Sequence, residues 1–75
     1  MTVGDLQKVF GRNLRQHRKH LGLSQEEFAD LLDVHRTYVG GVERGERNLS
    51  LQSIEVMCSR LDLPAEILLF SDPGQ

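Results

Sequence analysis

The sequence predicts an all-α domain of five helices, and three features of the chain support this prediction. Apolar residues recur at intervals of three and four along most of the 75 residues, which is the period of an amphipathic helix. Residues that favour helix N-caps stand before several of these stretches, and glycine follows two of them. No repeat, linker or convincing strand interrupts the pattern. We therefore expect one domain over residues 1–75, with its core at about 10–70.

The first helix is expected to run from Asp5 to about Leu21, and Gly22 should end it. Its apolar stripe follows the helical period and consists of Leu6, Phe10, Leu14, His17 and Leu21. Its basic residues lie off that stripe and are Arg12, Arg15, Arg18 and Lys19. We interpret His17 as a histidine at the edge of the core rather than a metal ligand, because no partner ligand stands at a suitable spacing.

Residues 24–45 predict two short helices joined by a tight turn. Ser24 is a strong N-cap residue, and Glu27 completes a capping box by reaching back to the Ser24 amide. The first of these helices should turn one face inward, made of Phe28, Leu31 and Leu32. Ala29 is small enough for a second helix to cross closely. Asp33 is the expected turn residue, because aspartate tolerates the left-handed conformation better than most residues.

The second of these helices is expected from about His35 to Arg44, with Val39 and Val42 turned inward. Gly45 should end it as the residue that follows the C-cap.

The last third of the chain predicts two more helices. Ser50 can cap a helix from about Leu51 to Leu61, whose buried face would be Leu51, Ile54, Met57, Cys58 and Leu61. Cys58 is best explained as a small core residue, since a lone cysteine has no companion for a disulfide or a metal. Pro64 suits the first turn of a short helix over Ala65–Phe70. We expect Ser71 to Gln75 to be a frayed tail.

Charge is unevenly distributed along a chain whose net charge is −2. Residues 1–20 carry five basic residues and one acid, whereas residues 24–33 carry four acids and no base. A folded chain can therefore present a basic face and an acidic face, and only the nearby face acts on a phosphate within a Debye length of about 10 Å. The negative net charge does not exclude nucleic acid as a partner, and the alternative is that both faces are only solvated helix surfaces.

The segment SQEEFADLLDVHRTYVGGVERG, residues 24–45, resembles the helix-turn-helix of the phage-repressor/Cro family, also called the xenobiotic-response-element family. The likeness extends from Phe10 to Phe70 and implies a five-helix, repressor-like DNA-binding domain. The chain departs from the family at Asp33, where glycine is most common. The segment HRTYVGGVERGERNLSL, residues 35–51, also resembles the controller proteins of restriction–modification systems, a small branch of that family.

The resemblance implies that the second helix of this pair enters the major groove of double-stranded DNA with its first residues against the base edges. Those residues are His35, Arg36 and Thr37. Arg36 has the fork geometry that bonds guanine O6 and N7 together. The residues expected to contact phosphates surround this helix, and they are Gln25, Tyr38, Arg44, Arg47, Asn48, Ser50 and Ser53. Arg44 could instead pair with Glu43 or with the acidic helix.

Gly40 and Gly41 lie within the expected groove-reading helix, where each glycine costs about 1 kcal/mol relative to alanine. One explanation is that they let the helix approach DNA closely, and the other is that an exposed helix end tolerates them. Replacing both by alanine would separate the two, because unchanged or tighter DNA binding would reject close approach.

Four consecutive apolar residues, Ile67, Leu68, Leu69 and Phe70, cannot all be buried within so small a domain. We expect them to form the interface of a homodimer that binds a pseudo-palindromic operator. The resemblance to controller proteins implies regulation of the protein's own gene and of the linked endonuclease gene, with RNA polymerase as a further partner. A plain phage or plasmid repressor, or an antitoxin-type regulator, remains the alternative within DNA binding.

Other classes of protein fit the sequence less well. The histidines and Cys58 show neither nucleophile–base nor metal spacing, so we expect no enzyme, no metal and no cofactor. A protein-interaction module of the same fold remains an alternative. No apolar run approaches the roughly 20 residues that span a membrane, and a single cysteine suits a reducing compartment, so we expect a cytoplasmic protein with no membrane partner.

Overall fold

The computed structural model describes residues 2–70, and this part of the chain forms five α-helices and no strand. The helices are α1 (Asp5–His20), α2 (Gln25–Leu32), α3 (Arg36–Glu43), α4 (Leu51–Leu61) and α5 (Ala65–Leu69). Their order confirms the all-α, five-helix prediction, and each predicted boundary agrees within one residue. The expected tail at residues 71–75 lies outside the described residues.

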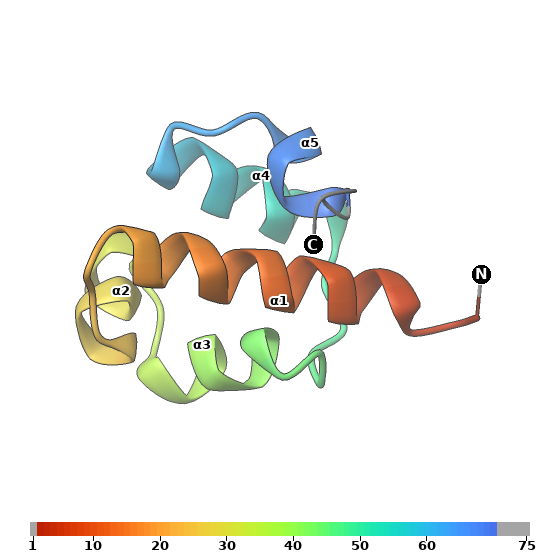
Figure 1. Cartoon of the computed structure of the whole chain (residues 1–75), viewed down its shortest axis with the longest axis horizontal. Coiled ribbons are helices and arrows are strands. Elements are labelled where there is room, and N and C mark those ends of the chain that lie inside the picture. The colour runs from red at the N-terminus through yellow and green to blue at the C-terminus, as the bar shows by residue number, and fades with distance from the viewer. Residues whose placement is uncertain (1, 71–75) are drawn as a thin grey trace.

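Helix α1 lies in the middle of the molecule, with α3 on one side and α4 and α5 on the other (Figure 1). Phe10 and Leu14 of its predicted stripe are buried, as the helical period requires. Leu6 and Leu21, at the two ends of that stripe, are exposed. The prediction that they are buried is wrong, because Leu6 lies in the first turn of α1 and Leu21 follows its last residue, beyond the buried Phe10 and Leu14.

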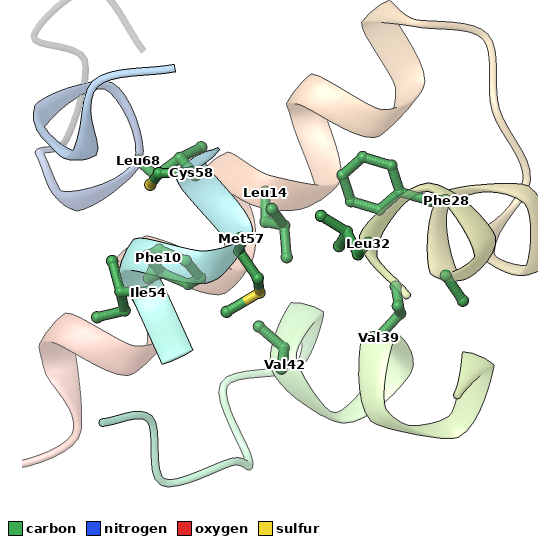
Figure 2. Packing of buried hydrophobic residues seen from close by; sticks show 11 residues of the cluster. Phe10, Leu14, Phe28, Leu32, Val39, Val42, Ile54, Met57, Cys58 and Leu68 are labelled. Atoms are coloured by element: carbon green, nitrogen blue, oxygen red, sulfur yellow. The ribbon is translucent and has the colours of Figure 1, made fainter. Parts of the chain in front are cut away.

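The core contains side chains from all five helices (Figure 2). Phe28 and Leu32 of α2 meet Val39 and Val42 of α3, while α4 and α5 contribute Ile54, Met57, Cys58 and Leu68. Leu51 was expected in this core but is 80% exposed. Leu51 is the first residue of α4, and no other element within residues 2–70 packs over this end of the helix.

Gly11 allows α1 and α3 to cross with their backbones close together. A Cβ atom at this position would overlap the carbonyl oxygen of Val42 and lie 2.9 Å from that of Glu43. Those oxygens belong to backbone and cannot move aside, so an alanine would push the two helices apart. The sequence pattern did not indicate this role for Gly11.

Asn13 of α1 holds α5 in place. Its side-chain amide donates to the carbonyl oxygens of Leu68 at 3.0 Å and Phe70 at 2.7 Å, which satisfies groups left unpaired where α5 ends. Leu68 is thereby packed into the core and is 1% exposed, whereas Ile67 and Phe70 face solvent. The proposed interface at residues 67–70 must therefore be corrected: the Leu68 side chain is occupied inside its own protomer.

Candidate nucleic-acid interface

Local hydrogen bonds fix both ends of α2, and the bonds at its C-terminal end form the turn that leads into α3. The Ser24 hydroxyl accepts from the Glu27 amide at 3.1 Å, and the Ser24 amide donates to Glu27 Oε1 at 2.8 Å, which confirms the capping box. Hydrogen bonds to the Glu27 carboxylate from the Ser24 amide, and then from the Ser24 hydroxyl, lower the pKa of that carboxyl. Asp33 has the predicted left-handed conformation, with φ 59° and ψ 46°, and the Val34 amide then donates back to the Ala29 carbonyl at 3.0 Å. The direction of α3 is thus set by the turn itself.

The first residues of α3 project from the molecule. His35, Arg36 and Thr37 are all exposed. His35 is the N-cap of α3: its Nδ1 accepts from the Thr37 amide at 3.1 Å, which leaves Nε2 as the nitrogen that can face a ligand. The Arg36 side chain is 67% exposed, and it pairs at 4.0 Å with Glu26, whose side chain is 73% exposed. An ion pair of this kind contributes little and is easily exchanged for a better acceptor.

A buried ion pair lies behind α3. Arg18 Nε donates to Glu43 Oε2 at 2.7 Å, and Arg18 Nη2 donates to Glu43 Oε1 at 3.0 Å. Arg18 also donates to the Leu23 carbonyl, and the Gln25 amide donates to Glu43 Oε1 at 3.1 Å. The bond to Glu43 raises the pKa of the Arg18 guanidinium against the opposing effect of burial. Placing Arg18 on the basic face was therefore wrong, because Glu43 neutralises it inside the protein.

The loop after α3 is tied to α1 by Gln7. The Gln7 amide donates to the Arg47 carbonyl at 2.8 Å and to Asn48 Oδ1 at 2.9 Å. The Arg47 guanidinium lies over the Tyr38 ring, 5.2 Å from the ring centroid. Arg44 pairs with Glu46 at 2.9 Å rather than with Glu43 or the acidic helix, so both alternative partners named for it are wrong.

Ser50 and Ser53 perform a structural role. The Ser50 hydroxyl caps α4 by accepting from the Ser53 amide at 3.0 Å, and the two hydroxyl oxygens are 2.9 Å apart. This confirms Ser50 as the N-cap and leaves an exposed pair of hydroxyls at the start of α4.

The structure therefore arranges the predicted contact residues in two groups. One is the exposed start of α3, and the other is the end of α3, where Gln25 bonds Glu43, with the segment from Arg44 to Ser53 that follows it. Gly40 and Gly41 lie between them and are buried, so the interpretation as an exposed helix end is wrong. Sequence reasoning missed three residues that support these groups: Gln7, Arg18 and Glu43. Each acts across 25 residues or more of chain, and no local pattern marks such a contact.

A family model described as helix-turn-helix matches residues 14–68. The chain belongs to this helix-turn-helix family. It is 37% identical over 65 residues to control protein C.SmaI of Serratia marcescens, a match that spans 87% of this chain and 77% of the relative. It is 39% identical over 74 residues to control protein C.BamHI of Bacillus amyloliquefaciens, spanning 96% and 91%.

Solved helix-turn-helix structures share the fold. The crystal structure of the restriction–modification controller protein C.AhdI from Aeromonas hydrophila superposes with a TM-score of 0.79 at 43% identity, over 91% of this chain and 99% of that protein. These relatives confirm the resemblance to controller proteins. The segment matched by the helix-turn-helix family model contains every predicted DNA contact, from Gln25 to Ser53.

Residues 2–70, which the structure describes, contain neither a metal-binding cluster nor a helix that could span a membrane. No group of three histidine, cysteine, aspartate or glutamate side chains in that range is placed to hold a metal ion. None of its helices combines the length and the apolar character that crossing a bilayer requires.

Proposed function

We propose that this protein is a sequence-specific DNA-binding transcriptional regulator that reads the major groove with the start of α3. The observation that carries the proposal is the exposure of Arg36 and Thr37 at the N-terminus of a helix whose position is set by the Asp33 turn. Arg36 would bond guanine O6 and N7, and Thr37 would contact a thymine methyl or a base edge. His35 would present Nε2 to the same groove.

The phosphate contacts would come from the flanking groups. Gln25 opens α2, where free amides and the positive end of the helix dipole favour an anion. Arg44, Arg47 and Asn48 follow α3, and their exposed side chains leave the groove-reading residues clear. The remaining candidates are Tyr38, Ser50 and Ser53. Such contacts fix the position of the protein on the duplex and add little sequence information.

Selection of bound sequences from random duplex DNA tests this proposal, with the wild type compared with Arg36→Ala. We expect the variant to lose about 1–3 kcal/mol of binding free energy and to relax its preference at one position. Arg60→Ala is the matched control, because Arg60 is an exposed arginine of α4 that also pairs with one exposed carboxylate, Asp33. Equal losses in the two variants would reject base reading by Arg36.

The salt dependence of binding separates DNA recognition from a protein-interaction module. Binding of DNA releases counterions, so the affinity should fall steeply with salt, with a logarithmic slope of about −0.9 for each phosphate neutralised. A wild-type protein that shows no such slope and selects no sequence would favour the interaction module.

We further propose that the regulator acts as a homodimer joined through α5. Ile67 and Phe70 are 55% and 68% exposed, and Leu6 and Leu69 line a shallow hollow beside them. The protomer measures 32 × 25 × 19 Å, so two copies fit side by side on half-sites one helical turn, about 34 Å, apart. The operator would then be a pseudo-palindrome.

Sedimentation at micromolar concentration tests the dimer. Ile67→Ser with Phe70→Ser should shift the protein to monomer and weaken operator binding. Leu21→Ser is the control, since Leu21 is a large exposed apolar residue that follows α1, at the opposite end of this helix from Leu6. A wild type that sediments as a monomer and binds the operator with one protomer would contradict the dimer.

The similarity to control proteins leads us to propose regulation of the protein's own gene and of an adjacent endonuclease gene, in the cytoplasm, without catalytic activity. Activation would involve RNA polymerase. The acids of α2, Glu26, Glu27 and Asp30, are an exposed surface beside α3 that such a partner could contact. Asp30→Asn should reduce activation in a reconstituted transcription assay without weakening operator binding, because Asp30 belongs neither to the capping box nor to the Arg36–Glu26 ion pair. Weaker operator binding by this variant would contradict the assignment.

A further inference from the structure

Two arginine side chains cover the glycine pair of α3. A Cβ atom built at Gly41 would lie 3.0 Å from Arg47 Nε, 3.1 Å from its Cγ and 3.6 Å from its Cδ. At Gly40 the Cβ atom would meet the tip of another arginine, Arg44 Nη1, at 3.1 Å, and the Gln25 amide at ordinary contact distance. Gly41 therefore lies under the middle of an arginine side chain, whereas Gly40 touches only the end of one.

Arg47 is held from two further directions. Its guanidinium lies over the Tyr38 ring at 5.2 Å from the centroid, which is within the range of a cation–π contact. Its carbonyl oxygen accepts from the Gln7 amide at 2.8 Å, so the backbone that carries the side chain is anchored to α1. The side chain runs from this anchor across Gly41 to the ring.

We propose that Gly41 is a positioning residue: the missing side chain lets Arg47 lie flat across α3 against Tyr38 and holds this cation in place before DNA arrives. The effect on binding rests on the proposed DNA-binding function, but the seating of Arg47 does not. Glycine is a poorer helix former than alanine, so Gly41 lowers the stability of α3 but leaves room for the Arg47 side chain. An arginine whose rotamers are already restricted loses less entropy on binding a phosphate.

Gly41→Ala tests the proposal, with Gly40→Ala as the matched control. Both variants gain the same helix propensity and meet side chains rather than backbone, so both should fold, and Gly41→Ala should in addition lose the packing of Arg47 on α3. Without DNA, the Arg47 side-chain protons of the wild type and of Gly40→Ala should show ring-current shifts from Tyr38 by NMR. Gly41→Ala should lose these shifts.

Operator affinity supplies the second readout. We expect Gly41→Ala to weaken binding by about three- to tenfold and to make the salt slope shallower, and Gly40→Ala to stay within about twofold of the wild type. Tyr38→Leu should release Arg47 and weaken binding more than Tyr38→Phe, which keeps the ring under Arg47 and removes only the hydroxyl that is a candidate phosphate contact. The substitutions at Tyr38 keep the proposal testable if Gly41→Ala is poorly folded.

A double-mutant cycle distinguishes seating of Arg47 from close approach of the helix to DNA. In an Arg47→Ala background, Gly41→Ala should cause no further loss, because the glycine acts through the arginine. Additive losses, or equal losses from the two glycine variants, would overturn the proposal, as would unchanged ring-current shifts in Gly41→Ala. If the wild type selects no DNA sequence, the proposed function fails, and the NMR comparison still decides whether Gly41 seats Arg47.

Discussion

Replacing Arg18 by methionine should destabilise the fold strongly, because it leaves the Glu43 carboxylate buried without its cation. The Arg18 side chain is 11% exposed and that of Glu43 is 3% exposed, and their two hydrogen bonds measure 2.7 and 3.0 Å. In the variant, the Gln25 amide still donates to this carboxylate, at 3.1 Å. Breaking a buried pair from one side reduces the free energy of unfolding by about 3–5 kcal/mol.

That loss is large for this chain. A domain of this size has roughly 4–11 kcal/mol of stability, at about 0.05–0.15 kcal/mol per residue. Each kcal/mol lowers Tm by about 4–8 °C in domains of 60–100 residues, so Arg18→Met should melt at least roughly 12 °C below the wild type. Urea unfolding followed by far-UV circular dichroism, at one fixed protein concentration, gives the free energy directly.

The double variant Arg18→Met with Glu43→Leu tests whether the loss of stability comes from the unpaired Glu43 carboxylate. With both charges removed, the groups that lose a partner are the Gln25 amide, which is exposed, and the Leu23 carbonyl, which is half-buried, and both can bond water. Its stability should therefore return close to the wild-type value, and the cycle should show strong coupling. The reasoning would be refuted if Arg18→Met cost less than about 1 kcal/mol, or if the losses from the two single variants simply added.

Three further predictions concern other sites. Gly11→Ala should lower the free energy of unfolding by about 1–3 kcal/mol or more in a urea titration, because its Cβ would meet the backbone of α3; wild-type stability would contradict the close crossing. Burial, and then the charge of His20, lowers the pKa of His17, so the unfolded state binds more protons and stability should fall as the pH drops below about 6.5. His17→Gln should reduce the change in Tm between pH 7 and pH 5. A change as large as that of the wild type would show that another group causes the pH dependence. Burial, and then Glu66, raises the pKa of the Cys58 thiol, so its reaction with a disulfide reagent should follow the unfolding rate; rapid labelling of the native protein would disagree.

Features encoded within a few neighbouring residues were predictable from the sequence. The capping box of Ser24 and Glu27, the left-handed Asp33 and the cap of Ser50 each depend on residues within four positions, so the local chemistry was sufficient. The exposed start of α3 followed from the same turn. These features explain why both the fold and the general position of the candidate interface could be anticipated.

Features that depend on where separate helices meet were not predictable. Gln7 reaches a loop 41 residues away at Asn48, and Asn13 reaches 57 residues to Phe70. The helical period shows which face of a helix is apolar, but it does not show how far the neighbouring elements extend. Leu6, Leu21 and Leu51 follow the period and are exposed for this reason.

The attachment of α5 through Asn13 has a consequence for operator choice. Helix α1 contacts α3 on one side and α5 on the other, so no flexible joint separates the groove-reading helix from the proposed dimer contact (Figure 1). In such a dimer, the distance between the two α3 helices would be fixed. If one base pair were inserted between the half-sites, the DNA would have to twist or bend for both α3 helices to bind. The energy of that deformation would fall on the DNA and not on the protein.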